Sequence, residues 1–229
     1  MAQEISREGN FGGPVTRPSV RTSTEWAAGG SLIEAVLGIA AVVLAILGLV
    51  GVKALTLASI ATIVLGVAFV FAGVALASRY TTLLTETSGG RLESTEFGGG
   101  LGLEVLAGFA GIVLGILALI GTHTLTLMAA AAIALGLTLL FSSGSFSRLS
   151  ALEISRAGVG DEARAVAREA VMATNGLEML VGIGAAALGV LALVGIAQLS
   201  LILVALLALG GVLLFAGSLF GGRLLSMLQ

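Results

Sequence analysis

Six long apolar runs dominate the sequence and limit what the chain can fold into. Each run is close to the roughly 20 residues that a helix needs to cross the hydrocarbon core of a bilayer. The runs are apolar all round, whereas membrane β-strands alternate apolar and polar residues. We therefore predict an all-α, polytopic membrane bundle whose six transmembrane helices are Leu32–Val50, Leu55–Ala77, Leu101–Ile120, Leu125–Phe141, Leu177–Val194 and Leu199–Phe220.

The composition agrees with lipid as the main solvent around the chain. Of the 229 residues, 57% are hydrophobic and only 10% are charged, whereas a soluble domain has about 25% charged residues. The net charge of −2 gives no electrostatic basis for binding nucleic acid. Cysteine is absent, which excludes disulfides and thiolate chemistry.

A two-helix unit recurs three times in a common register. Glu34, Glu104 and Glu178 begin the odd-numbered runs, and glycines and an arginine follow at matching positions. We predict three tandem hairpins that stack on one another, because a repeated unit this small buries little surface alone. A bundle with approximate threefold symmetry and a linear row of hairpins both satisfy the pattern. The other matching sets are Gly51, Gly121 and Gly195, then Gly66, Gly136 and Gly210, then Arg79, Arg148 and Arg223.

The repeat also divides the chain. Within each hairpin the turn is about four residues long, and its glycine suits a left-handed helix cap. Residues 161–172 are Ala-rich and predict a short helix that lies on the membrane surface or continues into the fifth span. The predicted divisions are a polar, partly disordered tail at 1–30, hairpin repeats at 31–83, 101–149 and 175–229, and connections at 84–100 and 150–174.

The basic residues predict an orientation. Of the 11 Lys and Arg residues, 10 lie in the tail, in the C-terminal end or in the polar stretches between the apolar runs, roughly Ser78–Gly100 and Ser143–Gly176, and the three short turns hold only Lys53. By the positive-inside rule, both termini and both connections face the cytoplasm.

Small residues form a stripe along one face of each odd-numbered helix. Such faces allow helix backbones to approach closely in lipid, so we predict that the odd helices make the tight interior contacts, or bind a helix of another membrane protein. The stripe residues are Gly38, Ala41, Ala45 and Gly48 in the first helix, Gly108, Gly111 and Gly115 in the third, and Gly182, Ala185 and Gly189 in the fifth.

The repeated glutamates allow two interpretations. In the first turn of a helix, Glu34, Glu104 and Glu178 would stabilise the helix dipole, and Ser31 and Asn175 have capping-box spacing to two of them. Paired with Arg79, Arg148 and Arg223, they would form ion pairs on the cytoplasmic face. The alternative is a ring of carboxylates that lines a pore mouth or binds a cation. We favour capping and pairing.

Reactive groups are missing from the middle of the spans. No charged residue or histidine lies there, although ion-coupled transporters usually carry one. Thr62 and Thr138 can bond to their own helices. We find no pattern for a catalytic residue, a cofactor or a metal, and we expect a protein that is not an enzyme.

Two segments resemble a known family. Gly111–Leu119 and Ala134–Leu140 are similar to the short hydrophobic repeat of HdeD-like membrane proteins. The resemblance implies a six-span protein of the bacterial inner membrane, linked to acid resistance in the family's namesake, and it implies no catalytic residues. We therefore expect a scaffold or stress-related component in the lipid bilayer, joined to other membrane-protein subunits or to copies of itself. The alternative is a channel or facilitator for a small neutral solute or protons.

Overall fold

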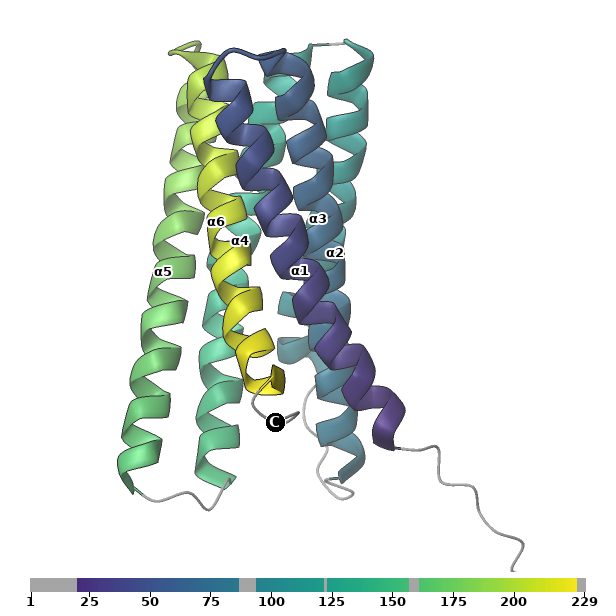
Figure 1. Cartoon of the computed structure of the whole chain (residues 1–229), viewed down its shortest axis with the longest axis vertical. Helices are drawn as coiled ribbons and strands as arrows, with labels where there is room; N and C mark the ends of the chain where they lie inside the picture. Colours follow the sequence, from purple (N-terminus) through teal and green to yellow (C-terminus); the bar gives the residue numbers. More distant parts are fainter. Residues whose placement is uncertain (1–19, 87–93, 122, 157–160, 226–229) are drawn as a thin grey trace, which may run out of the picture.

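The computed structural model describes residues 20–86, 94–121, 123–156 and 161–225, and these residues form six helices (Figure 1). The helices run alternately in opposite directions, so that the three short turns within the hairpins lie at one end and the connections between hairpins at the other (Figure 1). The helices are α1 (Val20–Leu49), α2 (Ala54–Glu86), α3 (Ser94–Ile120), α4 (Thr124–Arg156), α5 (Asp161–Leu193) and α6 (Gln198–Leu225).

Most helices extend past the apolar runs at the connection end. Helix α1 begins within the predicted tail, α2 and α4 continue into the predicted connections, and α3 begins within one of them. The segment 161–172 continues into the fifth span as part of α5, which was one of our two alternatives. A helix that has formed in an apolar run extends at little cost, because only its nucleation is unfavourable. The rest of the predicted tail, residues 1–19, lies outside the described residues.

The helices fit a multi-pass membrane protein. Five contain an apolar stretch long enough to cross a bilayer, and α1 contributes a shorter one at Ile33–Leu49 within the described side chains. The five longer stretches are Ala54–Ala75, Gly102–Ile120, Thr124–Ser143, Asn175–Leu193 and Gln198–Ser218.

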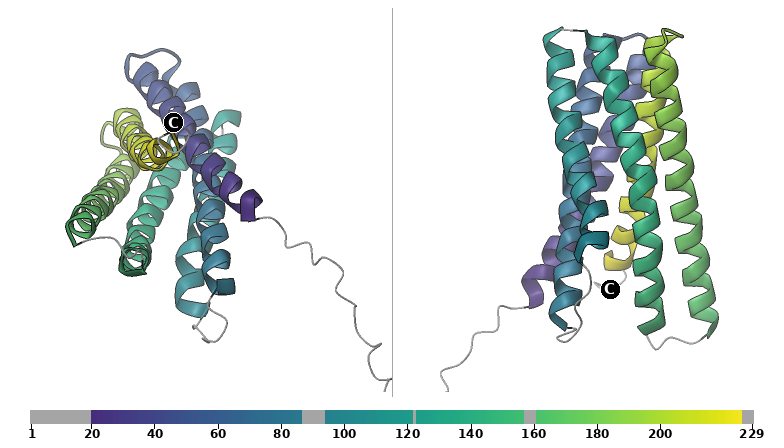
Figure 2. Two further views of the ribbon diagram at one scale, coloured as in Figure 1. Left: turned by 60° about the horizontal axis from the view of Figure 1, so that its bottom comes forward. Right: turned by 180° about the vertical axis from the view of Figure 1, so that it is seen from behind.

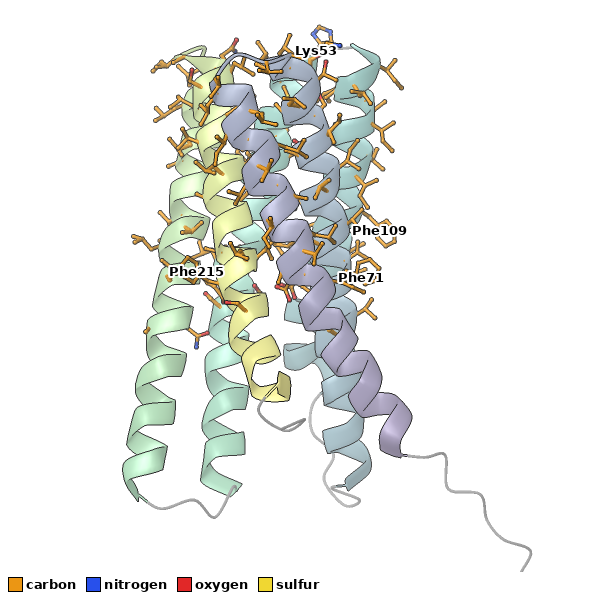
Figure 3. All side chains as sticks on the ribbon, in the orientation of Figure 1. Lys53, Phe71, Phe109 and Phe215 are labelled. Carbon is orange, nitrogen blue, oxygen red and sulfur yellow. The ribbon has the colours of Figure 1, made fainter. Side chains whose placement is uncertain are left out.

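The outer surface of these stretches is apolar. Leucine, isoleucine and valine side chains project outward from Lys53 at the turn end down to the level of Phe71, Phe109 and Phe215 (Figure 3). The three phenylalanines are at least 40% exposed. A surface of this kind is stable against lipid tails, which therefore surround these apolar stretches.

Helices α2, α4 and α6 form the centre of the bundle. They pack on one another, whereas no two of α1, α3 and α5 are in contact within the described residues. The small faces of the odd helices do make tight contacts, as predicted, but with the even helices rather than with one another. The even helices carry large apolar side chains on the faces that meet, and these fill the centre, while the small faces of the odd helices pack against the even helices from outside.

The centre is a column of apolar side chains. Leu65, Leu135 and Leu209 occupy matching positions in the three even helices, and all three are fully buried. Phe69 and Met128 are also fully buried and belong to the same core cluster. The column therefore fills the centre of the bundle mainly with hydrocarbon, with the hydroxyl groups of Ser59 and Thr62 buried beside it.

Glycines mark the seams where an odd helix meets an even one. Gly66 of α2 faces Gly108 of α3 so closely that a Cβ atom on Gly66 would lie 2.6 Å from the Gly108 carbonyl oxygen. Gly136 and Gly182 form the same contact between α4 and α5, and so do Gly210 of α6 and Gly38 of α1. The α1–α6 seam joins the first helix to the last, and it is nearly as extensive as the other two.

The short turns share one conformation. Gly51 has a φ of 94°, and its N–H donates to the Gly48 carbonyl at 3.0 Å, while the Val52 N–H donates to the Leu47 carbonyl at 3.1 Å. These two bonds form a Schellman motif, which confirms the predicted left-handed glycine cap. Gly121 and Gly195 have a positive φ at the matching positions of the other two turns. In each turn the residue two positions after the glycine also has a positive φ, namely Lys53, His123 and Ala197.

Substitution of Gly66 tests the seam. In Gly66→Ala the new methyl group would overlap the backbone of α3, and we expect a loss of stability of about 1–3 kcal/mol. The unfolding midpoint in detergent measures the effect.

Gly184→Ala is the matched control, because a Cβ atom there meets nothing within 4 Å. This variant should unfold at or above the wild-type midpoint. Equal midpoints for the two variants would contradict the close approach of α2 and α3.

Candidate functional site

The three repeated glutamates lie well inside their helices. Glu34, Glu104 and Glu178 are preceded by many helical residues in α1, α3 and α5. Our interpretation of these residues as first-turn or capping-box groups is therefore wrong. The polar segments before them are helical, so the orphan N–H groups and the positive end of each dipole lie far from the carboxylates.

Two of the glutamates are buried. Glu104 is 5% exposed and Glu178 is 8% exposed, and Glu34 is half-buried. Acidic side chains are rarely buried to this degree without a partner. Their burial indicates that the fold directs them into the protein rather than along its surface.

The three carboxylates converge. The Glu104 carboxylate interacts electrostatically with both Glu34 and Glu178. These side chains come from helices that do not touch one another in the described structure. Long side chains must therefore reach from the three outer helices toward the middle of the bundle, past the ends of the apolar column. We call Glu34, Glu104 and Glu178 the glutamate cluster.

Small residues on the even helices make room for the cluster. A Cβ atom on Gly73 of α2 would lie 3.4 Å from the Cβ atom of Glu104. The matching positions in α4 and α6 are Ser143 and Gly217, and all three residues are buried. One turn before Gly73 in α2, in the next layer of the column, the residue is the large Phe69. The even helices thus change from large to small residues at this layer, and the small residues leave space in which carboxylates replace hydrocarbon.

One oxygen of the cluster lacks a partner. Glu104 Oε2 is buried and makes no hydrogen bond with the described residues, and a buried polar atom in this state costs about 1–3 kcal/mol, more when it is charged. The predicted partners of the glutamates, Arg79, Arg148 and Arg223, lie in α2, α4 and α6. Their side chains lie outside the described part of the chain, so the predicted ion pairs stay predictions.

The cluster is not arranged as a metal site. Among the described side chains, no three His, Cys, Asp or Glu groups are placed so that they could hold a metal ion. A small cation needs its ligand oxygens within about 2.0–2.6 Å. Any group bound by all three glutamates would have to span a wider separation.

Hydroxyl groups in the spans bond to their own helices. Thr62 donates to the Ala58 carbonyl and Thr138 to the Ala134 carbonyl, each at 2.8 Å, as predicted. Ser143, beside the cluster, donates to the Leu140 carbonyl at 2.8 Å. These bonds use the hydroxyl protons within the helices, so the residues do not define a polar path along the bundle.

From the sequence, the convergence of the glutamates is only the alternative to capping and pairing, although one signal favours it. Glu34 precedes Gly38 by four residues and therefore lies on the same helix face as the small-residue stripe. Glu104 and Glu178 have the same spacing to Gly108 and Gly182. A carboxylate on the packing face is directed at the neighbouring helix, and this spacing could have predicted its burial.

Comparison of the chain with protein-family models, with curated proteins and with solved structures finds no match. The fold and the cluster thus define a class, a multi-pass helical membrane protein with buried carboxylates at one end of its core. The resemblance to HdeD-like proteins stays a prediction.

The variant Glu104→Gln tests whether repulsion among the three carboxyl groups destabilises the folded protein. The amide has nearly the same shape as the carboxyl group and cannot be ionised, so at a pH at which the carboxyl groups are ionised we expect the unfolding midpoint of the purified protein to rise, by about 1–3 kcal/mol in stability.

Glu34→Gln is the control, and it should have a smaller effect because Glu34 is only half-buried. If Glu104→Gln were clearly less stable than wild type in a simple sodium buffer, the carboxylate would already be paired and the repulsion absent.

Proposed function

We propose that this chain is a non-enzymatic membrane protein that acts as a scaffold or stress-related component, as an accessory subunit of a larger membrane assembly or as a homo-oligomer. In this proposal the three hairpins are tandem repeats, all six helices span the bilayer, and the termini and connections face the cytoplasm of a bacterial inner membrane. The observation that carries it is the packed apolar column at the centre of the bundle.

The column favours a structural role over transport. Leu65, Leu135 and Leu209 belong to one core cluster and have no exposed surface, and a path for water or solutes would need polar groups or space there. The tight glycine seams hold the outer helices in place around this core. Such a bundle is a rigid body with an apolar exterior, which suits a component that other membrane proteins pack against.

The helical extensions supply a surface outside the bilayer. Beyond the level of Phe215, α4 and α5 continue side by side as a long pair, and the α2–α3 pair separates from them (Figure 2). A partner on the connection side can reach these extensions without entering the lipid. The proposed partners are therefore other membrane-protein subunits or further copies of this chain.

The second candidate is a channel or facilitator for protons or a small neutral solute. The glutamate cluster favours it, because carboxylates at one end of a bundle can concentrate cations. The apolar column stands against it, since a conducting state would require the even helices to separate.

Extraction in a mild detergent tests the scaffold proposal. The protein released from its native membrane should migrate as an assembly larger than one chain, and the assembly should keep its composition through a second purification step. Migration as a single chain under every mild condition tried would contradict the proposal.

Reconstitution in liposomes tests the alternative. We expect proton and glycerol fluxes no faster than those of protein-free vesicles, because the column blocks the axis. A flux that the protein raises and that Leu135→Phe lowers would favour the channel instead.

Single cysteines test the six spans, because the chain has no cysteine of its own. Cysteines introduced at Ala2 and Gln229 should react with an impermeant maleimide only after the membrane is opened, and one at Lys53 should react in intact cells. Reaction of Ala2→Cys and Gln229→Cys from opposite sides would show an odd number of spans and contradict the proposal.

A further inference from the structure

The glutamate cluster presents an acceptor that no described residue satisfies. Glu104 is only 5% exposed, and its Oε2 atom has no hydrogen-bond partner in the described part of the chain. The two neighbouring carboxylates add negative charge to the same region. An unpaired acceptor at this depth is costly, and more so when it is ionised, so a positive group with a hydrogen to donate would stabilise the arrangement.

The spacing of the cluster selects the kind of cation. The described side chains offer no arrangement of three ligands for a metal ion. A guanidinium group is wider and carries five N–H donors in a planar fork, and an alkylammonium group carries three. Such groups can donate to carboxylates that are too far apart to share one small ion.

The neighbouring residues leave Glu104 open to a donor. Gly73, against which Glu104 packs, has no side chain, and the hydroxyl proton of Ser143 is used by the Leu140 carbonyl. At the same end of the bundle α6 ends at Leu225, whereas α2 and α4 continue and diverge (Figures 1 and 2). A group that approaches from the connection side thus meets the cluster before the apolar column.

We propose that Glu34, Glu104 and Glu178 form a binding site for a cation with N–H donors, a guanidinium or alkylammonium group. The group either belongs to a separate molecule or is supplied by an arginine of this chain. The candidate arginines are Arg79, Arg148 and Arg223, each of which comes after the seam glycine in the sequence of its even helix. The site does not depend on the scaffold proposal, because it concerns binding by the isolated chain.

Equilibrium dialysis with isotope-labelled methylguanidinium tests the site in the purified full-length protein. At constant ionic strength the wild type should bind one methylguanidinium per chain, and its unfolding midpoint should rise by several degrees, since a ligand that binds only the folded state stabilises it. Tetramethylammonium, which has the charge without an N–H donor, should give no rise.

The variant Glu104→Gln should lose the bound methylguanidinium and the rise in midpoint. Glu34→Gln serves if Glu104→Gln does not fold, and it should weaken binding at least several-fold. Unchanged binding in the variant that folds would overturn the proposal. An equal rise with sodium or tetramethylammonium would overturn it too, because charge alone would then explain the effect.

A second set of variants separates the two sources of the cation. If an arginine of the chain already occupies the site, the wild type binds no methylguanidinium, but Arg79→Gln, Arg148→Gln or Arg223→Gln binds it and is stabilised by it. That result supports the proposal with an internal donor. Absence of binding in the wild type and in all three arginine variants would overturn it.

Discussion

Close approach of helix backbones at the three glycine seams is the constraint on which the rest of the bundle depends. Inside a bilayer, helices gain little from burying apolar surface, because lipid tails are as apolar as leucine, and association rests on packing. Gly66 and Gly108 bring α2 and α3 into backbone contact, and the equivalent pair Gly210 and Gly38 does so for α6 and α1. The last pair joins the first helix to the last, so the six described helices form a closed bundle.

Closure explains both the apolar column and the glutamate cluster. With the odd helices held outside by their small faces, the even helices meet at the centre and fill it with residues such as Leu65 and Leu135. One turn beyond each seam, the side chain on the same face of the odd helix is a glutamate. The ring therefore brings together three carboxylates that a row of hairpins would keep apart, and the hydrocarbon above them confines the cluster to one end of the bundle.

Much of the fold could be predicted from the sequence, because membrane spans and helix caps are local. Apolar runs fix the helices, and Gly51 fixes its turn through a positive φ. Which helices lie inside depends on contacts between distant segments, and small residues such as Gly108 fit an interior and a peripheral seam equally well. The same limit applies to Glu104. The segment before it resembles the start of a helix but is itself helical, so Glu104 is not a first-turn residue. Its burial depends on how the helices pack, which the local sequence does not determine.

Cross-linking across the α1–α6 seam tests the closed ring most directly. A Cβ atom on Gly210 would lie 3.1 Å from the Cβ atom of Ala41, near the roughly 3.8 Å of a disulfide, so Ala41→Cys with Gly210→Cys should form a disulfide within one chain under mild oxidation. Gly136→Cys with Ala185→Cys, at 3.2 Å, is the matched pair for the α4–α5 seam. A ring predicts that both pairs cross-link. A cross-link in the α4–α5 pair alone would show a row of hairpins and contradict the closed bundle.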